Sequence, residues 1–251
     1  MVHFVGAGPG AVDLITVRGA RLLREADVII YAGSLVNPDL LYEKKETCEV
    51  FNSAYMTLEE VIEVITEHEK KQNRIVRLHT GDPSIYGAIK EQMKQLEQLQ
   101  IPYEVCPGVS SFCGAAASMN VEYTLPDVSQ SLIITRMEGR TSVPSRESIE
   151  SFATHQSTMV IFLSTGMLEE LANRLIQGGY AADTPAAICY KVTWPEEKTF
   201  SCTIGTLADT AKKNGITKTA LIIVGKILNS SFRRSDLYNP TFETEYRGKT
   251  Q

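Results

Sequence analysis

Several features that mark membrane, secreted and zinc-stabilised proteins are missing from this sequence. Its 251 residues contain no run of about 18 apolar residues, the length that a membrane-spanning helix needs. The chain enters an apolar segment at Val2, without the basic start, long apolar stretch and small-residue cleavage site of a signal peptide. The five cysteines are scattered without CxxC spacing, which argues against a disulfide framework and against a zinc site. We therefore expect a soluble, cytoplasmic protein that neither enters a membrane nor holds a metal.

An excess of positive charge is missing as well. Lys and Arg number 25 against 30 Asp and Glu, so the net charge is -5. This balance gives no general attraction to nucleic acid, which we do not expect as a partner, and an anionic ligand would have to be held by local cations. Hydrophobic residues make up 43% of the chain, enough for a substantial core in one large domain or two small ones.

Short β-branched runs alternate with helical patterns along the chain. Thr57 and Glu60 form a capping-box pattern ahead of an apolar stripe over residues 58–65, which predicts a helix there. The alternation predicts an α/β fold with largely parallel strand pairing, at least in the first half. The expected strands are Val2–Val5, Val28–Tyr31, Ile75–Leu78, Tyr103–Cys106, Leu132–Thr135, Met159–Leu163, Ala186–Cys189, Thr199–Thr203 and Ala220–Val224.

A break in this alternation near Met119–Asp127 predicts two domains. We assign residues 1–119 to an N-terminal α/β domain, residues 120–228 to a C-terminal α/β domain and residues 229–251 to a polar tail. The stretch Glu138–Ser148 is polar and rich in Arg, Ser and Thr, so we expect it to form an exposed loop of the second domain.

A glycine-rich segment, Gly6-Ala7-Gly8-Pro9-Gly10, follows the first expected strand. Glycines at this place permit a tight turn and a close approach of backbone to ligand. A dinucleotide-binding Rossmann turn is one alternative, but it needs GxGxxG ahead of a helix that receives pyrophosphate. Here the third glycine comes too early, Pro9 removes a backbone donor, and Asp13 adds negative charge near the expected phosphate. The pattern disfavours a phosphate cradle, and alone it fits a structural turn as well as a ligand loop.

Two further motifs follow expected strands, at the sheet edge where open α/β folds bind ligands. In Thr80-Gly81-Asp82-Pro83, the carboxylate of Asp82 can accept hydrogen bonds from a ligand, or it can cap backbone amides of the turn. In Pro107-Gly108-Val109-Ser110-Ser111, the serines can touch a ligand or cap the helix that follows. We expect a structural role for the lone His79, and we assign no catalytic residue because no triad is visible.

These motifs together resemble the tetrapyrrole (corrin/porphyrin) methyltransferase superfamily. They come in the family's order and cover most of the chain, and their details are similar to the precorrin-4 and cobalt-precorrin-4 C11-methyltransferase group of cobalamin biosynthesis. Tyr190-Lys191-Val192 and Ser142 depart from that group's pattern. The segments that carry the resemblance are Val5–Gly10, Tyr31–Val36, Thr80–Pro83, Pro107–Ser111, Ile134–Arg136, Glu138–Thr141, Thr193–Glu197 and Thr219–Gly225.

The resemblance implies two α/β domains with a trough between them for cofactor and substrate, in a fold distinct from the Rossmann fold, and a homodimer. It implies S-adenosyl-L-methionine as cofactor, S-adenosyl-L-homocysteine as product and a corrin-type tetrapyrrole as substrate. The sulfonium of this cofactor already activates its methyl group, so the protein has only to bind and align. The cofactor-binding residues that the resemblance implies are Pro9, Thr80, Gly81, Asp82, Ile85, Ser110, Ser111, Leu163 and Ala220.

A corrin carries several carboxylates and therefore needs local cations. Arginine suits this task because its planar fork donates two parallel hydrogen bonds to a carboxylate. Arg136 directly follows an expected strand and is the first candidate, together with Ser34 and Lys191 as further substrate contacts. Alternatively, Arg136 pairs with Glu138 and anchors the polar loop, and Arg140 is equally well explained as a solvated loop charge.

Two other classes of function stay open at the level of sequence. A related methyltransferase acting on ribosomal RNA or on a protein side chain would share the motifs, although an RNA enzyme should carry a basic surface. A non-enzymatic nucleotide-binding module or a nicotinamide-dependent oxidoreductase could use the same glycine segment. Binding of S-adenosylmethionine, S-adenosylhomocysteine and NAD distinguishes these classes.

Overall fold

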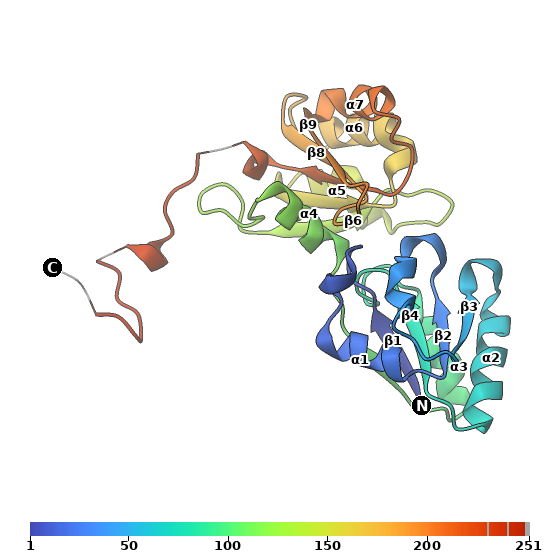
Figure 1. The fold of residues 1–251 in the computed structure, drawn as a ribbon. Helices are drawn as coiled ribbons and strands as arrows, with labels where there is room; N and C mark the ends of the chain where they lie inside the picture. The colour runs from blue at the N-terminus through green and yellow to red at the C-terminus, as the bar shows by residue number, and fades with distance from the viewer. Residues whose placement is uncertain (230, 240, 249–251) are drawn as a thin grey trace. The chain divides into compact units, whose positions relative to one another are not determined.

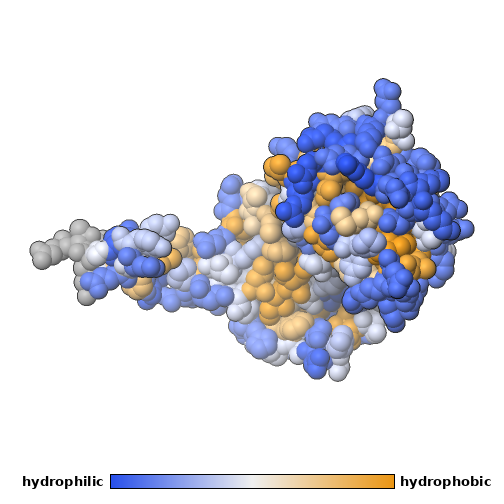
Figure 2. Space-filling model, turned by 90° about the horizontal axis from the view of Figure 1, so that it is seen from below, coloured by the Kyte–Doolittle hydropathy of each residue, from blue (hydrophilic) through white to orange (hydrophobic). Residues whose placement is uncertain are grey.

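The computed structural model describes residues 1–229, 231–239 and 241–248. They form two compact units, of which unit 1 holds residues 1–118 and 191–197 and unit 2 holds residues 119–190 and the chain from 198 onward. Over the described ranges, no helix combines the length and apolarity that crossing a bilayer requires. On the face drawn in Figure 2, hydrophilic residues cover most of the surface and hydrophobic residues emerge in patches between them.

Unit 1 is built on a parallel five-stranded sheet with the strand order β3-β2-β4-β1-β5 (Figure 1). Every registered pair in this sheet is parallel, so the carboxyl ends of all its strands lie at one edge. β1 lies between β4 and β5, which brings the segments that follow these three strands side by side. The strands are β1 (Val2–Gly6), β2 (Val28–Tyr31), β3 (Glu49–Asn52), β4 (Ile75–His79) and β5 (Tyr103–Cys106).

Helices cover both faces of this sheet, with α1 on one face and α2 and α3 on the other (Figure 1). Val5 packs in the core beside α1, whereas its neighbour Phe4 packs in the core beside α2 and α3. This double coverage explains why the strands of the first half are almost continuously apolar. The predicted capping box at Thr57 and Glu60 is present at the start of α2. The helices are α1 (Val17–Glu25), α2 (Leu58–Lys70), α3 (Ile89–Gln98) and α4 (Ser111–Met119).

Unit 2 contains a mixed five-stranded sheet with the strand order β6-β7-β10-β8-β9. β6 and β7 are parallel, and the other registered pairs are antiparallel. The three helices α5, α6 and α7 share one apolar core with alternate residues of the strands. The predicted α/β class, with parallel pairing dominant in the first half, is confirmed. The elements are β6 (Leu132–Arg136), α5 (Ile149–Ala153), β7 (Thr158–Phe162), α6 (Leu168–Gln177), β8 (Pro185–Tyr190), β9 (Lys198–Thr203), α7 (Leu207–Lys213) and β10 (Ala220–Val224).

Candidate cofactor and substrate site

The segments that follow β1 and β4 are joined by backbone hydrogen bonds at the carboxyl edge of the first sheet. The amide of Ala7 donates to the carbonyl of His79 at 2.7 Å. The amide of Gly8 donates to the carbonyl of Gly81 at 3.2 Å, and the amide of Gly81 donates back to the carbonyl of Gly8 at 2.9 Å. The glycine loop, residues 6–11, is therefore held against the Gly81-Asp82 turn by main-chain groups alone.

The segment that follows β5 approaches the same place too closely for any side chain. A Cβ atom on Gly108 would lie 2.2 Å from the carbonyl oxygen of Gly81 and 2.7 Å from the Cα atom of Gly6. Gly8 meets a different requirement, because its φ of +81° is in a region that side-chain-bearing residues rarely adopt. Three segments far apart in the sequence thus form one backbone cluster, which only glycine permits.

The carboxylate of Asp82 links two of the three segments of this cluster. One oxygen accepts from the amide of Gly108 at 2.8 Å, and the other accepts from the amide of Ser84 at 2.8 Å and from its hydroxyl at 2.5 Å. Partial burial raises the pKa of the carboxyl, but the hydrogen bonds from Ser84 and Gly108 outweigh it and hold the pKa of Asp82 below its ordinary value. The structure therefore shows Asp82 as a cap for backbone amides, the alternative that its sequence also suggested.

The other residues proposed for cofactor binding in unit 1 lie along this edge. Thr80 lies directly before the cluster, and Ser111 is the first residue of α4. Ile85 follows the Gly81-Asp82 turn, and its amide donates to the carbonyl of Asp82 at 3.2 Å. Pro9 and Ser110 are buried, and Thr80, Ile85 and Ser111 are partly exposed. Ser34 falls in the short helix η2 (Gly33–Leu35) after β2, and its side chain lies outside the part that the structure describes.

Arg77, a buried cation near this edge, was not predicted from the sequence. Arg77 lies in β4 and is 6% exposed, and its guanidinium donates to Gln92 Oε1, to the carbonyl of Ile30 and to Ser53 Oγ. Burial lowers the pKa of Arg77 to about 10, so it is still a cation at neutral pH. The sequence signal that could have identified this residue is an arginine within the otherwise largely apolar strand β4. Its hydrogen bonds join β4 to β2, to the residue that follows β3 and to α3, and so stabilise the sheet next to this edge.

His79 is buried and neutral in this setting. Its side chain is 3% exposed, and burial together with the charge of Arg77 lowers the pKa of His79 to about 3. Among the described residues, its Nε2 atom has no hydrogen-bond partner. The edge that holds the glycine loop therefore gains no positive charge from His79.

In unit 2, three of the proposed residues lie at a single sheet edge. Arg136 ends β6, Leu163 follows β7, and Ala220 begins β10. β6 and β7 are parallel and β10 runs antiparallel to β7, so the ends of the first two strands meet the beginning of the third. The fold thus brings together residues that are 84 positions apart in the chain, from 136 to 220.

The backbone at this second edge contains two left-handed residues that are not glycine. Leu163 has a φ of +53° with its side chain 63% exposed, and Thr219 has a φ of +59°. Such conformations cost about 1–3 kcal/mol each and persist where the surrounding structure imposes them. Thr165 provides part of that constraint, because its hydroxyl donates to the carbonyl of Ala220 at 3.0 Å and accepts from the amide of Ala220 at 3.4 Å. The expected strand Met159–Leu163 ends one residue early, at Phe162, because Leu163 leaves the extended conformation.

Arg136 is engaged by the loop that follows it. Its guanidinium donates to the carbonyls of Met137 at 3.1 Å, Thr141 at 3.2 Å and Ser142 at 2.8 Å. Over the described residues, none of these partners is a carboxylate, so the loop is anchored without the suggested pair to Glu138. The proposed substrate cation is therefore a loop anchor in this structure.

Lys191 makes its described contacts within its own short segment of unit 1. Its ammonium lies 3.3 Å from Glu196 Oε1 and 5.2 Å from the centre of the Trp194 ring, within range of a cation–π interaction. Lys191 and Ser34 belong to unit 1, and Arg136 belongs to unit 2.

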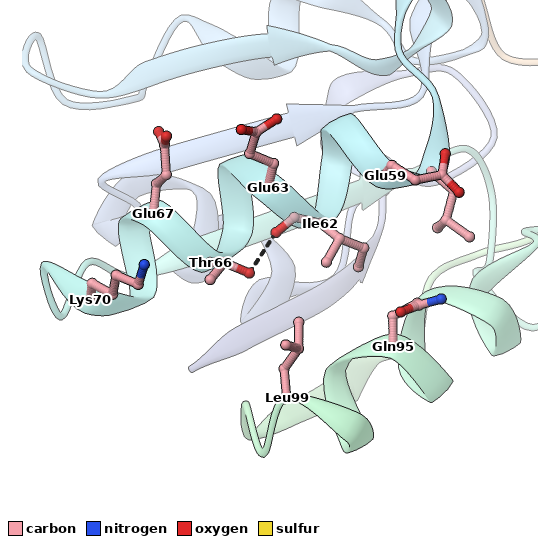
Figure 3. Close-up of a pocket in the computed structure, with 9 residues that line it drawn as sticks. Glu59, Ile62, Glu63, Thr66, Glu67, Lys70, Gln95 and Leu99 are labelled. Atoms are coloured by element: carbon pink, nitrogen blue, oxygen red, sulfur yellow. Dashed lines mark hydrogen bonds between the residues drawn. The ribbon is translucent and has the colours of Figure 1, made fainter.

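A groove of about 450 Å³ lies elsewhere in unit 1, between α2 and α3. Figure 3 shows Glu59, Glu63 and Glu67 in a row along α2, with Gln95 of α3 and Leu99, the residue directly after α3, on the other side of the groove. Its lining contains none of the three segments that meet at the carboxyl edge of the sheet. The groove is therefore separate from the candidate site.

Comparison with known protein families identifies the family of this chain. Residues 1–208 match the family model of the tetrapyrrole (corrin/porphyrin) methylases. The chain belongs to this family.

Particular members resemble the chain over nearly its whole length. It is 52% identical over 247 residues to the cobalt-precorrin-4 C(11)-methyltransferase of Methanocaldococcus jannaschii, covering 98% of this chain and 95% of that protein. The X-ray structure of a cobalt precorrin-4 methyltransferase of cobalamin biosynthesis superposes with a TM-score of 0.89 at 43% identity, covering 91% of this chain and 96% of that one. The uroporphyrin-III C-methyltransferase of Thermus thermophilus, in complex with S-adenosylhomocysteine, superposes with a TM-score of 0.75 at 26% identity, covering 91% and 93%.

Proposed function

We propose that this protein transfers a methyl group from S-adenosyl-L-methionine to carbon 11 of precorrin-4 or cobalt-precorrin-4. The observation that carries the proposal is the close backbone contact of Gly6, Gly81 and Gly108 at the carboxyl edge of the sheet of unit 1, which we call the glycine edge. It occurs in a chain that is 52% identical to a cobalt-precorrin-4 C(11)-methyltransferase over almost its full length. The related uroporphyrin-III methyltransferase that superposes on the chain contains the demethylated cofactor, which supports the same choice of cofactor.

The chemistry of the glycine edge fits this cofactor better than it fits a dinucleotide. Gly6–Ala11, Thr80–Ser84 and Pro107–Ser111 contain no lysine and no arginine, and the adjacent His79 is neutral. A pyrophosphate would need cations or free amide donors, whereas a sulfonium needs neither. The amides of Gly8, Gly81 and Gly108 are already bonded within the protein. This edge therefore supports neither the oxidoreductase nor the dinucleotide-binding alternative.

Bound S-adenosylmethionine supplies the activated methyl group, so the tasks of the protein are binding and alignment. Alignment of reacting groups can be worth about 7–11 kcal/mol of the barrier. We propose that Pro9, Thr80, Gly81 and Ser110 form the cofactor surface of unit 1, with Ile85 and Ser111 at its margin. Asp82 would act chiefly by holding this surface in shape, because its oxygens already accept from backbone amides.

The edge of unit 2 has a complementary task in this proposal. Leu163 and Ala220 would contact the cofactor, and Arg136 would bind a carboxylate of the tetrapyrrole by exchanging loop carbonyls for the substrate. Ser34 and Lys191 are proposed as further substrate contacts. A homodimer in the cytoplasm is proposed as well, on the family resemblance, and sedimentation of the purified protein tests the dimer.

The test is incubation of the purified protein with methyl-labelled S-adenosylmethionine and a panel of corrin precursors with and without cobalt. Mass spectrometry and NMR of the products should show one added methyl group at carbon 11 of the precorrin-4 type of substrate. Methylation of another ring carbon would overturn the position, and an absence of transfer to every precursor would overturn the function.

A further inference from the structure

The chain between β8 and β9 belongs to unit 1 and packs on the glycine loop. We call this segment, residues 191–197, the strap. The indole Nε1 of Trp194 donates to the carbonyl of Pro9 at 3.2 Å, and the amide of Ala11 donates to the hydroxyl of Thr193 at 3.0 Å. A Cβ atom on Gly10 would lie 2.1 Å from Cδ1 of Trp194. The strap and the loop are therefore in direct contact, and the contact requires glycine at position 10.

The strap is itself held in a fixed shape. One carboxylate oxygen of Glu197 accepts from the hydroxyl of Ser118 at 2.8 Å and also from the amide of Thr193. Thr193 is left-handed, with a φ of +67°, a conformation that a side-chain-bearing residue adopts only where its surroundings impose it. The ammonium of Lys191 stands 5.2 Å from the centre of the indole ring. The indole is thus presented to the glycine loop by an ordered support.

A second group holds the same loop at the next carbonyl. The side-chain amide of Asn37, which is 7% exposed, donates to the carbonyl of Gly10 at 2.8 Å. The carbonyls of Pro9 and Gly10 are therefore both occupied by side chains from outside the loop. A loop fixed in this way loses less conformational entropy when a ligand binds.

We propose that Trp194 is a positioning residue for the cofactor, which fixes the glycine loop in its binding conformation through the carbonyl of Pro9. This inference rests on the proposed function, since it takes S-adenosylmethionine as the ligand of the loop. Trp194 is the single tryptophan of the chain, so its fluorescence reports on this contact without any label.

The first test measures the affinity for S-adenosylhomocysteine by titration calorimetry in Trp194→Phe, which keeps an aromatic ring but lacks the N–H donor. We expect binding that is about threefold to tenfold weaker, the effect of one neutral hydrogen bond. Tyr103→Phe is the matched control, because it removes one hydrogen bond, from the Tyr103 hydroxyl to Glu97 at 2.7 Å, at the first residue of β5. The control should bind like the wild type. A lowered melting temperature with wild-type affinity in Trp194→Phe would show a merely structural role and overturn the inference.

The second test uses the wild-type protein and does not depend on the folding of a variant. Addition of S-adenosylhomocysteine should change the emission of Trp194 in a saturable way, with the same dissociation constant as calorimetry gives. Calorimetric binding without any change in emission would overturn the inference and leave the proposed cofactor intact. Absence of calorimetric binding would overturn the proposed cofactor, and the inference with it.

A double-mutant cycle sharpens the assignment to this one contact. Gly10→Ala should weaken S-adenosylhomocysteine binding in the wild-type background, because its methyl group displaces the indole. In the Trp194→Leu background the same substitution should cost less, since the obstructing ring is absent, and the two effects should not add. Additive effects on affinity would contradict a shared mechanism.

Discussion

The two sheet edges that carry the candidate residues are built in different ways. In unit 1 the edge is made of glycine backbone, and Gly6, Gly81 and Gly108 are in contact without side chains between them. In unit 2 the edge is made of side chains and strained backbone, with Leu163 left-handed and Thr165 bonded to the main chain of the next strand. The parallel sheet of unit 1 places its loops in one row, so close packing of backbone is enough to form a surface there. In the mixed sheet of unit 2, side-chain hydrogen bonds such as those of Thr165 hold the residues of the edge in place.

This difference predicts that the first edge tolerates no added atoms, whereas the second tolerates many substitutions. The largest effect should come from Gly108→Ala, whose methyl group would overlap the carbonyl of Gly81. We expect the free energy of unfolding to fall by about 1–3 kcal/mol, as for overpacked sites in general, and the affinity for S-adenosylhomocysteine to fall at least about tenfold. Denaturant unfolding and calorimetry measure the two quantities.

Gly166→Ala in unit 2 is the control for this prediction, since nothing lies within 4 Å of a Cβ atom there. Its free energy of unfolding should stay within about 0.5 kcal/mol of the wild type. Equal effects of the two substitutions would remove the contrast between the edges.

The next effect should come from Asp82, which joins two of the three segments. Asp82→Ala should lower the free energy of unfolding by about 1.5–3 kcal/mol, because it removes hydrogen bonds to a charged group. It should weaken S-adenosylhomocysteine binding less than Gly108→Ala does, because the lost bonds lie within the protein. The pKa of this carboxyl is below its ordinary value of 3.8, so the ionised form stabilises the fold above that pH and the contribution is lost as the pH falls through the folded pKa. Asp82→Asn should therefore lose less stability than the wild type on acidification below about pH 4. Parallel acid curves for the two proteins would show that Asp82 does not stabilise the cluster.

Arg136 tests the second edge through the substrate. Arg136→Ala should weaken corrin binding about tenfold and leave S-adenosylhomocysteine affinity unchanged, and Arg136→Lys should recover only part of the loss because it lacks the planar fork. Added salt should weaken corrin binding in the wild type more than in Arg136→Ala. Since Arg136 also binds loop carbonyls, amide exchange in residues 137–142 should quicken in the alanine variant. Faster exchange together with wild-type corrin affinity would show that Arg136 only anchors the loop and does not bind the substrate.

The smallest effect on stability should come from Leu163→Gly, because glycine relieves the left-handed strain while it adds freedom to the unfolded chain. We expect the melting temperature to stay level or rise, and S-adenosylhomocysteine affinity to fall about threefold through loss of an apolar contact. Gln72→Gly relieves similar strain, at a φ of +59° in unit 1, and should leave affinity unchanged. Full affinity in Leu163→Gly would remove this residue from the proposed cofactor surface.

Much of the fold could be predicted because most of its strands are short runs rich in apolar and β-branched residues. Val28–Tyr31, Tyr103–Cys106 and Ala220–Val224 agree with the structure at both ends. β3 (Glu49–Asn52) was missed, since it is an edge strand whose residues are only partly buried and begin with a charge. Edge strands give a weak hydrophobic signal because solvent replaces a neighbour on one side.

The candidate site was predictable only as a list of segments. The motifs indicated that Gly81-Asp82 and Pro107–Ser111 follow strands, but the order β4-β1-β5 that makes them neighbours comes from the folded sheet. Capping of turn amides by Asp82 was among the alternatives, but its bond to Gly108 and the partners of Arg136 were not predictable, because local pattern does not specify which carbonyl or amide a side chain meets. The contact of Trp194 with Pro9 joins residues 185 positions apart, a separation at which sequence periodicity carries no information.

Amide hydrogen exchange of the wild-type protein, with and without saturating S-adenosylhomocysteine, tests most directly whether the glycine edge of unit 1 binds the cofactor. Exchange should slow on binding at the glycine loop, at the Gly81-Asp82 turn and around Gly108, and should stay unchanged at the groove between α2 and α3. Protection confined to that groove, or bound ligand without any change in the three segments, would contradict the assignment of the cofactor to the glycine edge of unit 1.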